Sequence, residues 1–83
     1  MDVLLTEEAN KQYNKLIKTD KIKVDKKILL LFNDSRAGKK LSGEFIGKYS
    51  LKAWPYRIIY IIEESKKIIL ILSILHRQGV YKK

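Results

Sequence analysis

The sequence lacks cysteine altogether and has a single histidine, His76, among its 83 residues. Without cysteine there is neither a disulfide nor a thiolate metal site, and one histidine leaves too few ligands for a metal cage, so we expect no metal and no other cofactor. The missing thiols suit a reducing compartment, and we expect the chain in the cytoplasm. The first residues have neither the basic start nor the apolar core of a signal peptide. No apolar run approaches the roughly 18 residues that cross a bilayer, so we expect no membrane partner.

Acidic residues are scarce as well. Nine Asp and Glu oppose eighteen Lys and Arg, which gives a net charge of +9 at pH 7. The excess is uneven, because residues 1–35 carry +1 and residues 36–83 carry +8. A field of one sign favours a polyanion or an acidic protein as partner, although a well-solvated lysine-rich surface is the plainer alternative. No linker or repeat divides the chain, so residues 1–83 predict one domain.

The first half has the pattern of a short strand followed by helices. A short apolar segment at residues 3–5 predicts the strand. Apolar residues then recur along one side of residues 6–18, after a threonine cap and two glutamates, which predicts an amphipathic helix. The polar residues 19–23 predict a connection. Residues 24–33 predict a second helix, although an unbroken apolar run inside this segment leaves a strand as the alternative.

The second half changes to the period of two that is typical of strands. After a basic loop at residues 36–40, residues 48–53 alternate apolar side chains with Ser50 and two lysines, which predicts a half-buried strand with a cationic face. A Trp-Pro turn follows, then the β-prone residues 56–62 and, after a charged loop, the apolar run 68–75. Short loops make these strands an antiparallel meander. With the helical hairpin packed on one side of the sheet, the predicted fold is α+β in the order β-α-α-β-β-β.

This meander brings cationic residues that are distant in sequence to one end of the sheet. Lys52 and Arg57 lie on the two sides of the Trp-Pro turn. The third strand ends at His76 and Arg77, beside the start of the strand that carries Arg57. Tyr81 follows closely enough to fold back onto the same place. We therefore predict that these five side chains converge.

The chemistry that needs such a cluster is cleavage of RNA by its own 2′-hydroxyl. That reaction needs a base for the hydroxyl, cations for the charge that grows on phosphorus, and an acid for the leaving oxygen. Arginine binds phosphate through two parallel hydrogen bonds, histidine titrates near pH 6.5, and tyrosine acts as a base only where cations stabilise its phenolate. A mechanism built on two histidines is excluded.

Further basic residues outside the cluster are predicted to contact RNA. Taken singly, each of these basic residues, like the cations of the cluster and His76, also suits a solvated surface position, and Tyr81 also suits a hydrophobic latch. The predicted RNA contacts are Arg36, Lys39, Lys40, Lys48, Lys82 and Lys83.

Four segments and the first helix together resemble the RelE/ParE superfamily of type II toxin–antitoxin toxins. The segments are Leu-Ser-Gly at residues 41–43, Gly-Lys-Tyr-Ser-Leu-Lys at 47–52, Pro-Tyr-Arg-Ile-Ile-Tyr at 55–60 and His-Arg-Gln-Gly-Val-Tyr at 76–81. The resemblance covers nearly the whole chain. It implies a short strand, a helical hairpin and an antiparallel meander. RelE-like members are endoribonucleases that cut mRNA at the ribosome, and a cognate antitoxin blocks their cationic face.

The resemblance also implies a role for each member of the cluster. Lys52 matches a cation that stabilises phosphate, Arg57 the strand arginine that binds the scissile phosphate, and Arg77 a second phosphate-stabilising arginine. Tyr81 matches a tyrosine proposed as general base. His76 stands where several related toxins carry a histidine, as an acid or a base, and the sequence leaves open which of these two residues moves the proton.

One departure from the family pattern is Ser50, where many relatives carry Arg or Lys. Members of the ParE type share the fold but inhibit DNA gyrase, so fold alone does not decide the activity. The sequence and the resemblance together predict a toxin that cuts mRNA at the ribosome as an endoribonuclease, with mRNA, the ribosome and a cognate antitoxin as its partners. The alternatives to this activity are a gyrase inhibitor and a non-catalytic basic module that binds RNA or a protein.

Overall fold

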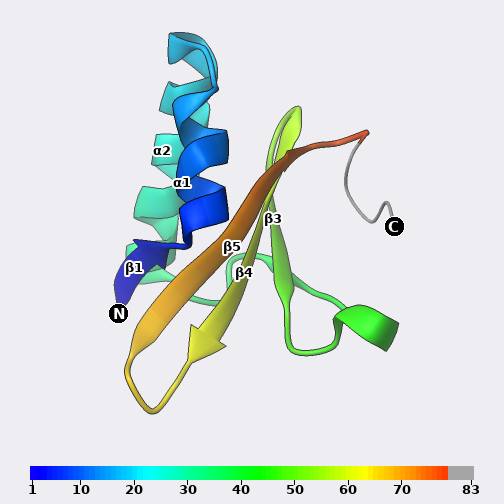
Figure 1. Ribbon diagram of the computed structural model, residues 1–83. Helices are drawn as coiled ribbons and strands as arrows, with labels where there is room; N and C mark the ends of the chain where they lie inside the picture. The colour runs from blue at the N-terminus through cyan, green and yellow to red at the C-terminus, as the bar shows by residue number, and fades with distance from the viewer. Residues whose placement is uncertain (79–83) are drawn as a thin grey trace.

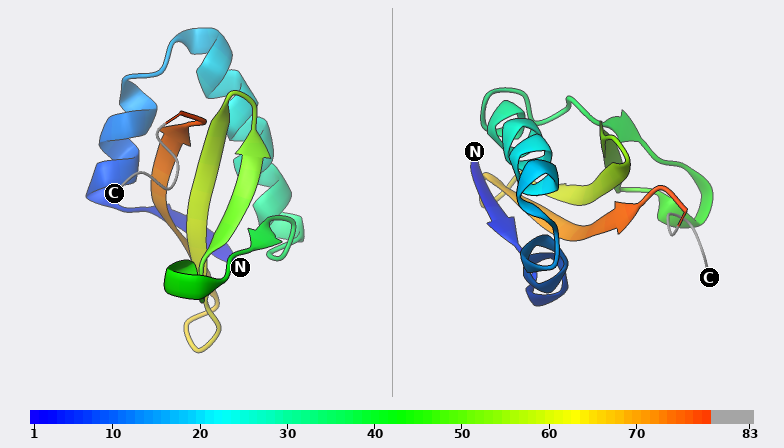
Figure 2. Two further views of the ribbon diagram at one scale, coloured as in Figure 1. Left: turned by 90° about the vertical axis from the view of Figure 1, so that its right-hand side faces the viewer. Right: turned by 90° about the horizontal axis from the view of Figure 1, so that it is seen from above.

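The computed structural model describes residues 1–78, which form a five-stranded sheet with two α-helices packed on one of its faces (Figures 1 and 2). The predicted α+β fold and its order of elements are confirmed. No helix in this part of the chain is long and apolar enough to span a bilayer. The elements in chain order are β1 (Asp2–Leu5), α1 (Glu7–Asn14), α2 (Lys18–Asn33), β2 (Lys39–Lys40), the short 3-10 helix η1 (Gly43–Phe45), β3 (Tyr49–Ala53), β4 (Tyr56–Glu63) and β5 (Ile68–His76).

The strands run in the order β1-β5-β4-β3-β2 across the sheet. The predicted antiparallel meander forms its centre, while β1 lies parallel to β5 at one edge and β2 pairs with β3 at the other. The sequence predicted a basic loop where β2 forms, because two lysines in a row have no strand periodicity of their own. Pairing on that side of β3 ends at Ser50, so the rest of β3 is an open edge.

The first helix is anchored to β5 by polar side chains. Thr6 caps α1 by accepting a hydrogen bond from the Ala9 N–H, and its hydroxyl donates to the Leu72 carbonyl at 2.9 Å. Beyond the end of β1, the Gln12 side-chain oxygen accepts a 2.7 Å hydrogen bond from the Ile74 N–H. These contacts complete the edge of β5 where no strand covers it.

The boundary between the two helices differs from the prediction. The first helix ends at Asn14 rather than residue 18, and α2 begins at Lys18 rather than residue 24. The polar residues assigned to a connection form the first turns of α2, where Thr19 and Lys23 are exposed and Asp20 accepts a hydrogen bond from the Tyr56 hydroxyl. Asp20 suits the helix start electrostatically and lies 3.9 Å from the Lys23 ammonium. These residues were therefore predicted as a loop because a polar helix start has the same composition as a loop.

The sheet has a helix-covered face and an uncovered one. Leu51, Ile58 and Ile74 are paired across β3, β4 and β5 and are buried beneath the helices. Ser50 and Ile59 are paired on the other face. The prediction of a solvated cationic face along β3 is wrong at Ser50, which is only 2% exposed. Lys52, two residues further on the same face, is exposed as expected.

Tyr60 fixes the segment that leads into β2. Its hydroxyl donates to the Ser35 carbonyl and accepts from the Gly38 N–H, both at 2.9 Å. A Cβ on Gly38 would lie 2.7 Å from this hydroxyl, so glycine is needed for the close approach. The buried tyrosine thus holds β2 against β3 and sets the position of Lys39.

Candidate functional site

Two of the predicted catalytic cations face each other across neighbouring strands. Lys52 of β3 is directly opposite Arg57 of β4. Both belong to the sheet face that the helices leave uncovered, because alternate residues of a strand share a face. Like charges in direct cross-strand pairs destabilise a sheet. The structure gives neither cation an ion-pair partner within residues 1–78, so this pair is a ready site for an anion.

Trp54 brings a third cation to the same end of the sheet. The indole ring is 55% exposed in the turn between β3 and β4. The Lys52 ammonium lies 6.0 Å from its centre and the guanidinium carbon of Arg77 lies 4.9 Å from it, both within the range of cation–π attraction. The Arg77 N–H donates to the Pro55 carbonyl at 2.8 Å, which ties the end of β5 to this turn. Lys52, Arg57 and Arg77, here called the cation cluster, therefore lie at the same end of the sheet.

A hollow of about 440 Å³ lies at the open edge of β3 and connects the cation cluster to α2. Lys27 enters it from α2, Lys39 from β2, Ser50 and Lys52 from β3, and Arg57 from β4. Ala37 and Leu51 complete the lining that residues 1–78 provide, and none of these lining residues is acidic. We call this space the β3-edge hollow. Four cations around one small space favour an anionic ligand.

His76 is placed differently from the cation cluster. It is opposite Tyr56 on the β4–β5 ladder, and the two rings meet edge to face with centres 5.6 Å apart. This register assigns His76 to the helix side of the sheet, opposite the face of Arg57. Its Nδ1 accepts a 3.3 Å hydrogen bond from the Gln78 N–H, so Nε2 carries the hydrogen in the neutral ring. In that form the ring can donate to a ligand but cannot take up a proton through Nε2.

The tyrosines near the sheet are poor bases. Burial, followed by the hydrogen bond to Asp20, raises the pKa of Tyr56 above its ordinary value. The hydrogen bond that Tyr13 donates to Asp25 raises its pKa as well. Burial raises the pKa of Tyr60. All three are therefore kept as neutral phenols at ordinary pH. The predicted base, Tyr81, lies outside the described residues, as do Lys82 and Lys83.

The other predicted RNA-contacting residues are scattered. Lys39 lines the β3-edge hollow, whereas Lys40 is paired with Tyr49 and lines a shallower hollow beside η1. Lys48 lies before β3, with its ammonium 5.9 Å from the Phe45 ring centre. Arg36 lies 3.4 Å from Glu64 in the turn after β4, at the other end of the sheet from the cation cluster. The structure does not bring Arg36 to this cluster.

Sequence reasoning missed Lys27 and Trp54 as members of the site. Lys27 is one of seven lysines in the first 35 residues, and only the packing of α2 against β3 distinguishes it. For Trp54 a signal existed, since it stands two residues from Lys52 in a tight turn, within reach of its side chain.

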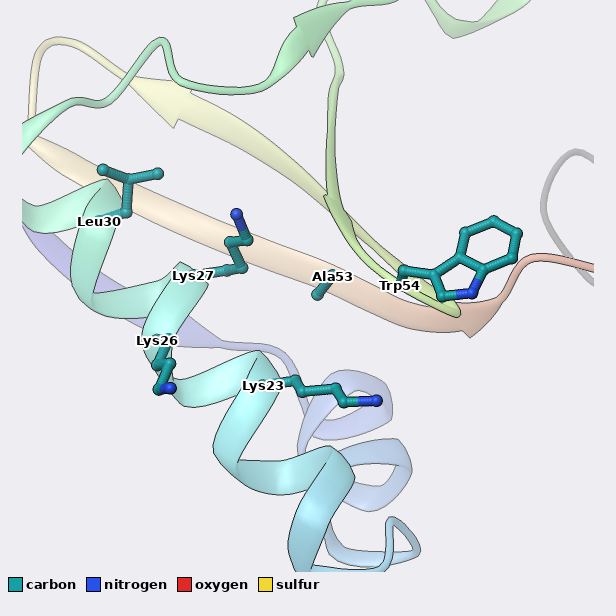
Figure 3. Close-up of a pocket in the computed structure, with 6 residues that line it drawn as sticks. All are labelled: Lys23, Lys26, Lys27, Leu30, Ala53 and Trp54. Carbon is teal, nitrogen blue, oxygen red and sulfur yellow. The ribbon is translucent and has the colours of Figure 1, made fainter.

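A second hollow, of about 380 Å³, lies between α2 and the end of β3 (Figure 3). Its lining is mainly apolar, from Leu30, Ala53 and Trp54, and three lysines of α2 surround it. Figure 3 shows Lys27 extended from α2 toward the strands, and Lys27 lines both hollows. The open edge of β3 therefore has a basic part and an apolar part. Nowhere in residues 1–78 do three or more histidine or acidic side chains gather as a metal site would require.

Comparisons with known proteins support the predicted family. Residues 3–81 match the family described as ParE toxin of type II toxin-antitoxin system, parDE. Toxin RelG of Mycobacterium tuberculosis is 33% identical over 48 residues, which cover 58% of this chain and 55% of that protein. The chain thus matches about half the length of that curated relative.

Solved structures of toxins share the fold over most of its length. The toxin–antitoxin complex RelBE2 from Mycobacterium tuberculosis matches with a TM-score of 0.83 and 28% identity, covering 92% of this chain and 90% of that one. The isolated RelE toxin of E. coli matches with a TM-score of 0.79 and 25% identity, covering 90% and 82%. The YoeB/ParE toxin from Agrobacterium tumefaciens, at 17% identity, a TM-score of 0.80 and coverage of 92% and 98%, shows the fold alone. The chain belongs to the ParE toxin family of type II toxin–antitoxin systems, within the RelE/ParE superfamily.

Proposed function

We propose that this toxin is an endoribonuclease that cleaves mRNA at the ribosome. The observation that carries the proposal is the cation cluster: Lys52 and Arg57 stand directly opposite each other, and Arg77 shares the Trp54 ring with Lys52. Two like charges directly opposite each other destabilise a sheet. Their presence at this position is explained if a phosphodiester with growing negative charge binds to them.

The nucleophile and the leaving group both belong to the RNA, so the protein supplies only proton carriers and cations. The 2′-oxygen attacks phosphorus, the bond from phosphorus to the 5′-oxygen breaks, and the products are a 2′,3′-cyclic phosphate and a 5′-hydroxyl. One proton leaves the 2′-hydroxyl and one reaches the 5′-oxygen. Arg57 holds the two non-bridging oxygens with its planar fork, and Lys52 and Arg77 stabilise the added charge in the transition state.

The proton carriers in this proposal are Tyr81 and His76. In the neutral ring, the hydrogen bond that His76 Nδ1 accepts leaves the hydrogen on Nε2, and donation from Nε2 suits contact with an oxygen of the substrate rather than removal of a proton. The raised pKa of Tyr56 removes the nearest described tyrosine as an alternative base. We therefore assign the base to Tyr81.

The proposal includes an antitoxin partner for this chain. RelBE2 of Mycobacterium tuberculosis and RelBE of E. coli are complexes of a toxin with an antitoxin, and the E. coli complex matches with 26% identity and a TM-score of 0.75. The apolar hollow beside Trp54 and the open edge of β3 suit an amphipathic segment with acidic residues. Binding there would cover the cation cluster.

The experiment is induction of the toxin in growing cells followed by mapping of mRNA 5′ ends. New ends inside translated regions are expected with the wild-type chain and with Lys66→Ala, a control that removes an exposed lysine from the turn between β4 and β5. Arg57→Ala should produce none while keeping or raising its melting temperature, since it also removes the repulsion between Lys52 and Arg57. Growth arrest without new ends, or identical ends with Arg57→Ala, would refute the nuclease. Induction of a DNA-damage response without cleaved mRNA would instead support the gyrase-inhibitor alternative.

A further inference from the structure

The β3-edge hollow contains a buried hydroxyl without a partner. Ser50 is 2% exposed, and its Oγ makes no hydrogen bond within residues 1–78. An unsatisfied buried hydroxyl is destabilising, so native proteins rarely keep one unless a ligand or water completes it. Ser50 lines the hollow together with Lys27 and Lys39. The unpaired hydroxyl therefore points to a ligand in this space.

The lysines beside Ser50 are arranged for an anion separate from the one at the cation cluster. Lys39 is directly opposite Ser50 on β2, and Lys27 approaches from α2 and is half-buried. Neither lysine has an ion-pair partner within residues 1–78. Two lysine ammonium groups without an ion-pair partner in the described chain favour an anionic ligand in this space.

The strand geometry sets the spacing between the two anion positions. Ser50 and Lys52 are two residues apart on β3 and share a face, which separates them by about 6.6 Å. This is close to the step between consecutive phosphates of an extended single strand. Proteins that bind single-stranded nucleic acid track its backbone with such a charged groove.

We propose that Ser50, Lys27 and Lys39 bind the RNA phosphate next to the cleaved one. The inference rests on the proposed function, since it places the cleaved phosphate at Lys52 and Arg57. The Ser50 hydroxyl donates to a non-bridging oxygen, and the two ammonium groups neutralise the charge. The site positions the strand and takes no part in bond breaking, so its loss weakens substrate binding rather than the chemical step.

The test measures cleavage of a chemically altered message on programmed ribosomes by the wild-type chain and by variants of it. A neutral methylphosphonate replaces, in turn, the phosphate on each side of the cleaved linkage. With the wild-type chain, one of the two replacements should raise the toxin concentration for half-maximal cleavage about tenfold or more, as expected for loss of one charge-assisted contact. Lys27→Gln should raise this concentration by a similar factor on the normal message. On the message with the effective methylphosphonate, Lys27→Gln should need no higher concentration than it needs on the normal message.

Two further variants separate binding from folding. Lys21→Gln removes the same charge from α2 on the side of Tyr13 and should behave as wild type. Ser50→Ala removes an unsatisfied hydroxyl, so it should keep or raise the melting temperature while weakening cleavage of the normal message. A merely structural serine would not give this combination.

The outcomes distinguish the second phosphate site from the proposed function. Two results would overturn the second site alone, provided that the wild-type chain cleaves the message. One is that the effects of Lys27→Gln and of the methylphosphonates add to each other. The other is that Ser50→Ala cleaves the normal message as well as wild type does. Lys27→Gln that weakens antitoxin binding but leaves cleavage unchanged assigns the hollow to a protein and also overturns it. A wild-type chain that cleaves no message overturns both.

Discussion

Reversing one charge of the cation cluster should stabilise the fold while abolishing activity. Lys52 and Arg57 are directly opposite each other on β3 and β4 without an ion-pair partner in the described chain. Lys52→Glu replaces repulsion with attraction, which is worth about 1 kcal/mol for a direct cross-strand pair. For a domain of this size the gain corresponds to a rise of about 4–8 °C in Tm. Toxicity should disappear, because the site for the scissile phosphate loses a cation.

The assay is thermal unfolding followed by circular dichroism at low and high salt. The gain should shrink in 1 M salt, where the screening length falls to about 3 Å. Lys66→Glu is the matched control, since it changes the net charge equally but lies in the exposed turn between β4 and β5. An unchanged or lower Tm for Lys52→Glu, or an equal gain for Lys66→Glu, would show that the pair is not repulsive.

Three further predictions concern the groups that hold the site in place. Tyr60→Phe should lower the free energy of unfolding by about 1–3 kcal/mol in urea titrations, because the Ser35 carbonyl and the Gly38 N–H lose their partner. Because the pKa of Tyr60 is raised in the folded state, the free energy of unfolding of the wild-type chain should keep its whole value below pH 10 and fall as pH rises above 10. Tyr60→Phe should make this fall less steep, and an unchanged dependence on pH would contradict the role given to Tyr60. Trp54→Ala removes the ring shared by Lys52 and Arg77 and should slow cleavage about two- to fivefold with little loss of Tm, whereas a tyrosine at the same position should restore most of the rate. Gln12→Ala should cost about 1 kcal/mol by freeing the Ile74 N–H, whereas exposed Asn10→Ala should cost nothing because alanine favours the helix, and an equal cost from both would contradict the role of this hydrogen bond.

The sequence predicted the meander well because its signals are local. Strand periodicity, the Trp-Pro turn and the charged loop before residue 68 each act within a few residues, and the short loops then allow only antiparallel pairing. The same reasoning brought Lys52, Arg57 and Arg77 to one end of the sheet.

What the sequence could not show depends on contacts between distant elements. The two-residue strand β2 exists because β3 offers it a partner and Tyr60 holds the segment before it. The burial of Ser50 on a face expected to be solvated follows from the three-dimensional packing, not from the alternation of side chains. Lys27 resembles its neighbouring lysines until α2 is packed against β3. Polar residues at the start of α2 were assigned to a loop because exposed helix turns and loops have the same composition.

The central claim is that Lys52, Arg57 and Arg77 act on one phosphodiester that the neighbouring 2′-oxygen attacks. The most direct measurement uses ribosomes programmed with a message whose mapped cleavage site carries a single 2′-deoxynucleotide. The account predicts that wild-type toxin cleaves the all-ribose message to a 2′,3′-cyclic phosphate and leaves the deoxy-substituted linkage intact, while Arg57→Ala cleaves neither. Cleavage of the deoxy-substituted linkage at the normal rate would contradict it.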